Sequence, residues 1–233
     1  IYRGGAVIFR RTENCILHDC YIHNVGGNGI FFDKYNRHSA ITGSFLTSIG
    51  ASAICFVGDP AGVRSPSFRY EEFVTLDKMD RAKGPLNENH PAYCEVYNNL
   101  ICNIGLFEKQ ITGVELSMCR NITISHNSIY DTPRAGINIS EGTWGGHIIE
   151  HNDIFNTVKE TGDHGSINSW GRDRFWHPDY NVMAQIVCEH PALILADIVN
   201  PIIIRHNRLR CDRGWDIDLD DGSSNYQIYD NLC

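Results

Sequence analysis

Short apolar segments return along this chain at a regular spacing. Each copy has an apolar triplet, a polar residue or His, an Asn, any residue and then an apolar residue. The clearest copies span 122–129, 147–154, 202–209 and 226–232, and a fifth ends at 98–101. Two earlier copies, at 16–22 and 41–46, replace the Asn. A pattern that recurs in this way is typical of a repeat architecture.

The turn position of the pattern falls at residues 20, 44, 99, 127, 152, 207 and 231. Most gaps are close to 24 residues, and the two gaps of 55 equal one such repeat plus about 31 residues. We therefore expect two insertions, one within 58–92 and the other within 171–200.

A second strand follows each uninterrupted turn nine residues later. Its apolar residues alternate with period two, so one set points inward and the other outward. The inward set is Ile30, Phe32, Ile137, Ile139, Ile217 and Leu219.

Strands this short, at this period, favour a stacked coil in which each strand pairs in parallel with its copy about 4.8 Å away. The Asn side chains then form a ladder along the axis, which is a structural and not a catalytic role. A leucine-rich repeat would need a Leu-rich consensus that is absent. The sequence predicts an all-β fold, a right-handed parallel β-helix that occupies residues 1–233 as a single domain.

The repeat already runs at Ile1 and is still running at Cys233, which predicts a segment of a longer chain. The net charge of −8 argues against a nucleic-acid or anionic-membrane partner, and no apolar run reaches 18 residues. Nine cysteines without CxxC pairs favour buried thiols over zinc ligands, with one or two disulfides as the alternative.

Function in a solenoid lies on outward strand positions and on loops. Each second strand begins at a Gly or an equivalent residue, and the residue two positions later points outward. From the N-terminal to the C-terminal repeats this outward residue changes from apolar to polar, and so does the next outward residue along the strand. The first row is Phe31, Cys55, Glu115, Asn138, Asn168 and Asp218.

The densest polar segment is the strand at 216–221. Asp218 and Asp220 alternate with Leu219, so they share a face with Cα atoms roughly 6.6 Å apart. Carboxylates repel one another and are unfavourable in strands. The segment therefore predicts a catalytic pair of carboxylates, in which Asp216 could take the place of one member. A Ca²⁺ site at Asp220 and Asp221 is a second functional interpretation. The alternative is an acidic surface that only keeps the protein soluble.

A second cluster spans 161–177, one repeat before the acidic strand. Its aromatic and basic residues suit a sugar subsite, through flat apolar faces and planar hydrogen-bond donors. Asp173 stands between two arginines, so we expect it to stay ionised and to act as a nucleophile or base; a salt-bridged loop anchor is the alternative. The expected subsite residues are His164, Asn168, Trp170, Arg172 and Trp176.

A third group borders the same face: Lys109, Arg134, Glu141 and Trp144. Arg134 and Trp144 are candidate substrate-binding residues, and Glu141 is a candidate acid. His126, His151 and His206 recur before the ladder Asn residues, so their regular spacing indicates a structural role.

The chain resembles the pectate-lyase-like superfamily of β-helix carbohydrate-active enzymes. Segments 133–138, 142–147, 163–173 and 215–222 are most similar to the β-helix glycoside hydrolases that include α-L-fucosidase and xylanase activities. That group uses two acidic residues, and Asp173 and Asp218 match its acidic stretches best. The resemblance implies a carbohydrate substrate and a secreted or periplasmic location.

Three functions remain open at this point. A glycoside hydrolase would use Asp218 and Asp173, with Asp216, Asp220 or Glu141 as substitutes, and would need no cofactor. A polysaccharide lyase would use Arg134, Arg172 or Lys109 as base, often with Ca²⁺. A glycan-binding or adhesin-like β-helix would have no catalytic activity.

Overall fold

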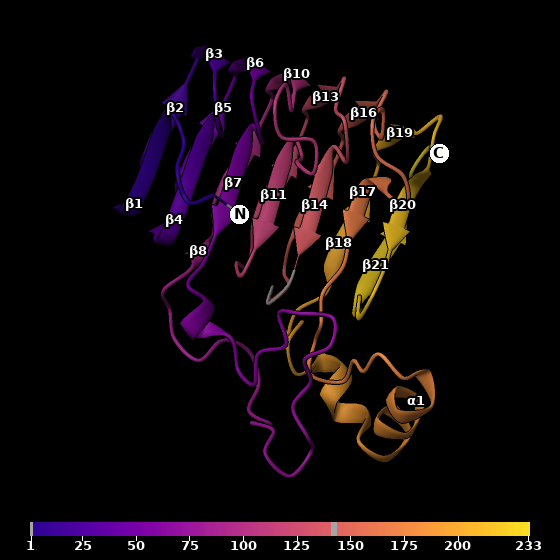
Figure 1. Cartoon of the computed structure of the whole chain (residues 1–233). Coiled ribbons are helices and arrows are strands. Elements are labelled where there is room, and N and C mark those ends of the chain that lie inside the picture. Colours follow the sequence, from indigo (N-terminus) through magenta and orange to yellow (C-terminus); the bar gives the residue numbers. More distant parts are fainter. Residues whose placement is uncertain (1, 141–143) are drawn as a thin grey trace.

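The computed structural model describes residues 2–140 and 144–233, which form a parallel β-helix with three sheets (Figure 1). We name each sheet by its first strand. The β1 sheet contains β1 (Val7–Glu13), β4 (Ile30–Arg37), β7 (Ile54–Val57), β11 (Val114–Ser117), β14 (Ile137–Ser140), β17 (Gly165–Ser169) and β20 (Trp215–Leu219), with β8 (Pro91–Ala92) beside β4.

The other two sheets complete each rung of the coil. The β2 sheet contains β2 (Ile16–His18), β5 (Ala40–Thr42), β9 (Glu95–Tyr97), β12 (Thr123–Ser125), β15 (Ile148–Glu150), β18 (Ile202–Arg205) and β21 (Tyr226–Tyr229). The β3 sheet contains β3 (Tyr21–Val25), β6 (Phe45–Ile49), β10 (Leu100–Ile104), β13 (Ser128–Tyr130), β16 (Asp153–Phe155) and β19 (Arg208–Arg210).

Apart from β8, every strand in these sheets pairs in parallel with its copy on a neighbouring rung. In the β1 sheet, for example, Val114 pairs with Ile54 on one side and with Ile137 on the other. The predicted β-helix is therefore confirmed, together with the inward and outward sets that follow from the alternation. Leu219 departs from its set, because it ends the last strand of this sheet and is 43% exposed.

The inward residues form one continuous core inside the coil. Phe9, Phe32 and Phe56 stack along the axis with ring centroids 4.4 Å apart at each step. Ile30 and Ile137 are fully buried in the same core. Burying an Ile or Phe side chain contributes about 1.5–3 kcal/mol, so the Phe stack stabilises the first three rungs and the Ile residues continue the core beyond it.

The predicted Asn ladder runs along the turn between the β2 and β3 sheets. The side-chain amide of each Asn donates to the side-chain oxygen of the next at 3.0 Å, from Asn99 through Asn127, Asn152 and Asn207 to Asn231. These residues satisfy backbone groups of the turns, because Asn127 also donates to the Val96 carbonyl. Their role is structural, as the repeat predicts.

The residue before each ladder Asn has a left-handed backbone, with φ between 53° and 59° at Asn98, His126, His151, His206 and Asp230. The three histidines stack on one another outside the coil, with ring centroids 4.9 and 5.1 Å apart. Their recurrence therefore reflects the turn geometry.

Two segments leave the coil at the C-terminal ends of β1-sheet strands and fold into a lobe (Figure 1). The segment between β7 and β8 contains the 3-10 helix η1 (Pro60–Gly62). The segment between β17 and β18 contains α1 (Tyr180–Glu189) and η2 (Pro191–Leu195), which the sequence did not predict. Apolar side chains of the two segments pack together: Leu76 and Met79 against Phe175, Ile186, Leu193 and Ala196.

All nine cysteines have free thiols, and Cys55, Cys94, Cys102 and Cys119 are buried. The expectation of buried thiols therefore holds for these four, whereas Cys188 and Cys233 are exposed and the other three are partly exposed. Across residues 2–140 and 144–233, no helix has the length and apolar character that a membrane crossing requires.

Candidate functional site

Polar side chains line the outer face of the β1 sheet on its C-terminal rungs. Glu115, Asn138, Asn168 and Asp218 occupy equivalent positions on β11, β14, β17 and β20. Because neighbouring parallel strands lie about 4.8 Å apart, this row forms a polar strip three strand spacings long.

The same row is apolar on the earlier rungs and is covered there. Phe31 and Cys55 pack with Met118 and Trp144 in a second apolar cluster outside the coil. Trp144 is only 1% exposed. The sugar-stacking role predicted for Trp144 is therefore wrong in this arrangement, because its ring faces are already occupied by protein.

Glu115 begins the polar strip and is held by the next rung. Both of its carboxylate oxygens accept hydrogen bonds from the Asn138 side-chain amide at 3.1 Å, and one also accepts from the Ser140 hydroxyl at 2.6 Å. Glu115 is 6% exposed. The arrangement presents a fixed, buried carboxylate on the outer face of the sheet.

Arg134 enters this face from the turn before β14. It is 8% exposed, and its Nε atom is buried without a hydrogen-bond partner. Burial lowers the pKa of Arg134, and the nearby charges of Glu115 and Asp218 act in the opposite direction. Arg134 therefore lies within electrostatic range of the carboxylates at both ends of the strip.

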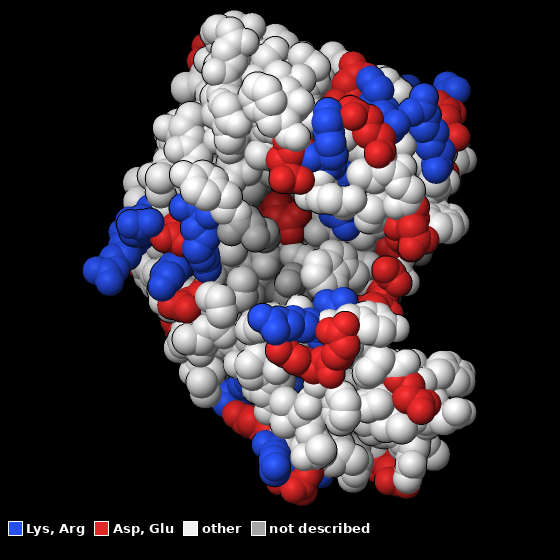
Figure 2. All heavy atoms as spheres, in the orientation of Figure 1, with Lys and Arg blue, Asp and Glu red and all other residues white. Residues whose placement is uncertain are grey.

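A cavity of about 640 Å³ opens over the first part of the strip. Figure 2 shows a hollow in the middle of this face with acidic side chains at its floor. Its walls come from the turns that precede the β1-sheet strands and from the strip itself. The lining residues include Tyr2, Phe107, Glu108, Gln110, Glu115, Arg134, Asn138, Ser140 and Trp170.

Acidic residues gather at the other end of the strip. Asp218 has a raised pKa, because burial disfavours its charge and because Asp220 and Asp163 repel it. Asp221 also has a raised pKa, from burial and from Asp220. Asp216 instead accepts a hydrogen bond from the Cys211 backbone N–H at 2.7 Å, so it supports the preceding turn.

His164 lies beside this acidic end, as the sequence predicts. Its Nδ1 is 3.0 Å from the Thr161 hydroxyl. Burial and the charge of Arg134 lower its pKa, while Asp163 and Asp220 act to raise it. Asn168, between Asn138 and Asp218, is 1% exposed and donates to the Asn138 side-chain oxygen at 3.3 Å.

An aromatic cluster surrounds Arg172 after β17. Its guanidinium carbon lies 5.0 to 5.5 Å from the ring centroids of Trp170, Trp176 and Tyr70. Trp170 lines the cavity, whereas Trp176 is 6% exposed. Of the two predicted stacking residues, Trp170 alone has an accessible position, and Trp176 serves to hold Arg172.

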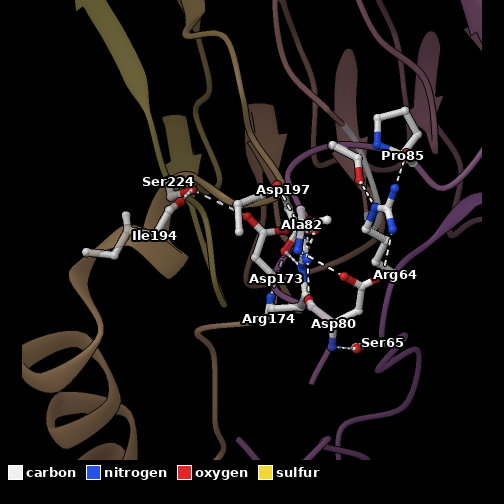
Figure 3. A network of polar contacts seen from close by, with 12 residues as sticks. Arg64, Ser65, Asp80, Ala82, Pro85, Asp173, Arg174, Ile194, Asp197 and Ser224 are labelled. Carbon is white, nitrogen blue, oxygen red and sulfur yellow. Dashed lines mark hydrogen bonds and ion pairs between the residues drawn. The ribbon is translucent and has the colours of Figure 1, made fainter. Parts of the chain in front are cut away.

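Asp173 lies apart from the strip, in the contact between the two inserted segments (Figure 3). It is 6% exposed and accepts a hydrogen bond from the Ser224 hydroxyl at 3.3 Å. Burial and the charge of Asp197 raise its pKa well above the usual range. The expectation that Asp173 stays ionised is therefore not supported, because burial and the charge of Asp197 outweigh the opposing charge of Arg174.

Arg174 is held by several polar contacts within the lobe. Its side chain forms a salt bridge with Asp197 at 2.9 Å and donates to backbone oxygens of Asp80, Ala82 and Ala196. The predicted salt-bridged anchor thus exists one residue beyond Asp173, and it joins the insertion before β8 to the one before β18.

The predicted Glu141 lies outside the described residues. Within the ranges that the structure describes, no three His, Cys, Asp or Glu side chains are grouped so as to hold a metal ion. The Ca²⁺ site expected at Asp220 and Asp221 stays a prediction, and it would need backbone or amide oxygens or water besides these two carboxylates.

Glu115 is the main site residue that the sequence did not single out. Its outward position was visible in the alternation, but a lone Glu in a strand carries no distinctive motif. Only the contacts with Asn138 and Ser140, 23 and 25 residues away, mark it as a built feature.

Comparison with solved structures shows the same fold. The chain superposes on the A-modules of the Azotobacter vinelandii mannuronan C-5 epimerases AlgE4 (13% identity, TM-score 0.55) and AlgE6 (12%, 0.54), covering 94% of this chain and 53% of each module. A structure titled glycoside hydrolase matches at 12% identity and TM-score 0.57, covering 94% of this chain and 36% of that one. The chain thus spans about half or less of these structures. No protein-family model and no curated protein matches it.

Proposed function

We propose that this protein is a carbohydrate-active enzyme that hydrolyses glycosidic bonds at the acidic end of the polar strip. Asp218 is the proton donor and Asp220 the base. The observation that carries the proposal is the position of Asp220, two residues after Asp218 and directly beyond the end of β20. Its charge adds to the effect of burial in raising the pKa of Asp218. The likeness in fold to a glycoside hydrolase and to polysaccharide epimerases supports a sugar substrate.

The two carboxyl groups divide the reaction between them. Asp218 transfers its proton to the glycosidic oxygen as the bond from that oxygen to the anomeric carbon breaks. Asp220 takes a proton from a water molecule, whose oxygen bonds to the anomeric carbon. This division of roles inverts the configuration at the anomeric carbon, and it requires the two carboxyl groups to lie about 6.5–9.5 Å apart so that a water molecule fits between them.

Asp220 replaces Asp173 as the partner of Asp218. Asp220 is exposed, whereas Asp173 is buried in the lobe. Trp170 and His164 border the same region and suit the sugar-binding role expected of them, since a flat aromatic face packs on a sugar ring.

The direct experiment measures reducing-sugar release from a panel of plant, algal and bacterial polysaccharides. Asp218→Asn should lower the rate about 10²- to 10⁴-fold, as expected for loss of a general acid. The matched control is Asp212→Asn, an exposed acid paired with Arg210. Full hydrolysis by the Asp218 variant would refute the assignment, and tight binding without turnover by the wild type would favour a binding module.

Proton abstraction from a uronate is the second candidate. Arg134 favours it, because its pKa is lowered in the direction that a base requires, and the epimerases of similar fold carry a C-5 epimerase title. The other bases considered are engaged, since Lys109 pairs with Glu160 at 2.9 Å and Arg172 lies among three rings. An ultraviolet-absorbing unsaturated product would decide for a lyase.

A further inference from the structure

Three arginines in the described ranges are less than 9% exposed, and two of them are fully bonded. Arg37 donates to backbone oxygens of Asn36, His90 and Glu88 and to the Glu88 carboxylate. Arg174 is bonded in the same way within the lobe. A buried guanidinium normally has such partners, because leaving a buried charge unpaired costs far more than one hydrogen bond.

Arg134 is the exception. Within residues 2–140 and 144–233 its side chain makes no hydrogen bond and no ion pair within 4 Å, although it is as buried as Arg37. Glu115 and Asp218 act on the Arg134 guanidinium through their charges, but neither of them forms an ion pair with it within 4 Å. A planar set of donors is thus left at the wall of the cavity.

The charge around Arg134 limits what can fill this position. It is the single basic residue among the described residues that line the cavity, and Glu108 and Glu115 line the same cavity. One anionic group can pair with the guanidinium. A ligand with a negative charge on every sugar would meet these carboxylates without further cations to offset them.

We propose that Arg134 forms a subsite for one sugar carboxylate, so that the natural glycan carries single uronic acids among neutral sugars. The planar fork of an arginine matches a carboxylate with two parallel hydrogen bonds. Exposed Phe107 and half-buried Trp170, at other points of the cavity wall, offer apolar faces to the neutral neighbours. This inference rests on the proposed function for its choice of a sugar ligand.

The test is calorimetric binding to the Asp218→Asn variant, which separates binding from turnover. The probes are a xylo-oligosaccharide with one glucuronic acid, its carboxyl-reduced form, a sulfated neutral oligosaccharide and tetragalacturonate. The acid-bearing probe should bind about 10- to 100-fold more tightly than its reduced form, the difference that a charge-assisted bidentate contact supplies. Arg134→Gln should abolish that difference, and Arg210→Gln, at an exposed site, should keep it.

Several results would overturn the inference. Equal binding of the acid-bearing and reduced probes by the Asp218 variant would do so even if Arg134→Gln failed to fold. Tighter binding of tetragalacturonate or of the sulfated probe would refute the single carboxylate, and so would the absence of binding by every uronate probe. If Arg134→Gln leaves the hydrolysis of neutral glycans unchanged, the proposed function stands whatever becomes of the carboxylate subsite. If the wild type binds the carboxylate-bearing probe but cleaves no glycan, the subsite stands and the proposed function fails.

Discussion

The Asn138 side-chain amide lies 3.1 Å from both carboxylate oxygens of Glu115, one rung away on the adjacent strand. The contact ties β11 to β14 outside the coil, on the face that carries the cavity. It makes the floor of the cavity part of the β1 sheet.

Replacing Asn138 by Leu should therefore destabilise the protein. The buried Glu115 carboxylate would lose two donors, and an unsatisfied buried polar group costs about 1–3 kcal/mol, with more for a charge. Urea unfolding monitored by circular dichroism would measure the loss. Gln227→Leu, an exposed amide on β21, should change stability by less than about 0.5 kcal/mol. An equal effect of both variants would contradict the importance of the contact.

Activity should depend on pH through Asp218. As proton donor it works only below its pKa, which burial and the charges of Asp220 and Asp163 raise. The rate should therefore fall as pH rises through that raised pKa. Asp163→Asn removes one repelling charge, so the alkaline limb of the kcat/KM profile should move to lower pH. Movement to higher pH, or no movement, would count against Asp218 as the acid.

Asp173 should make the protein less stable at higher pH. Its pKa is raised well above the usual range in the folded state, and in the unfolded chain it is about 3.9. The folded state therefore holds this proton more tightly, and stability is lost as pH rises from about 4 through the folded pKa. Asp173→Asn stays neutral, so its stability relative to the wild type should increase over that range.

Asp197→Asn is the matched variant within the same contact, and it should lower the stability of the protein where Asp173→Asn raises it. It leaves the buried Arg174 without its carboxylate, which costs about 3–5 kcal/mol for a broken buried pair. Chemical unfolding of both variants at several pH values would check the pair. Destabilisation of Asp173→Asn at neutral pH would argue that Asp173 is ionised in the folded protein.

The Asn ladder should be sensitive to a single truncation. Asn152 donates to the Ile124 carbonyl at 2.9 Å and accepts from the backbone and side chain of Asn127 at 3.0 Å. Asn152→Ala leaves these buried groups unpaired at about 1–3 kcal/mol each. Thermal unfolding should show a large drop, whereas Asn181→Ala, on an exposed part of α1, should show little. A small drop for Asn152 would mean that the ladder accompanies the fold without stabilising it.

The fold was predictable because its information is local and repeated. The turn Asn residues and the alternating apolar residues such as Ile137 and Ile139 recur on nearly every rung, so each copy supports the others. The helix α1 was missed because it occurs once, in a segment whose apolar residues pack on the other insertion and not on the coil.

The candidate site was predictable only in part. Outward positions follow from the alternation of apolar and polar residues, which by itself predicts that Asn168 and Asp218 share one face. Burial does not follow from it. Asp173 and Trp144 were chosen for their chemical type, but the lobe and the second apolar cluster enclose them. Contacts between residues far apart in the chain decide such cases.

The polar strip receives one residue from each rung. Duplication or loss of a rung between β14 and β20 would therefore move Arg134 relative to Asp218 by one strand spacing, about 4.8 Å, and would leave the chemistry of each residue unchanged. Descendants of one ancestral coil can change which sugar along a glycan is recognised, relative to the bond that is cut, without evolving a new active site.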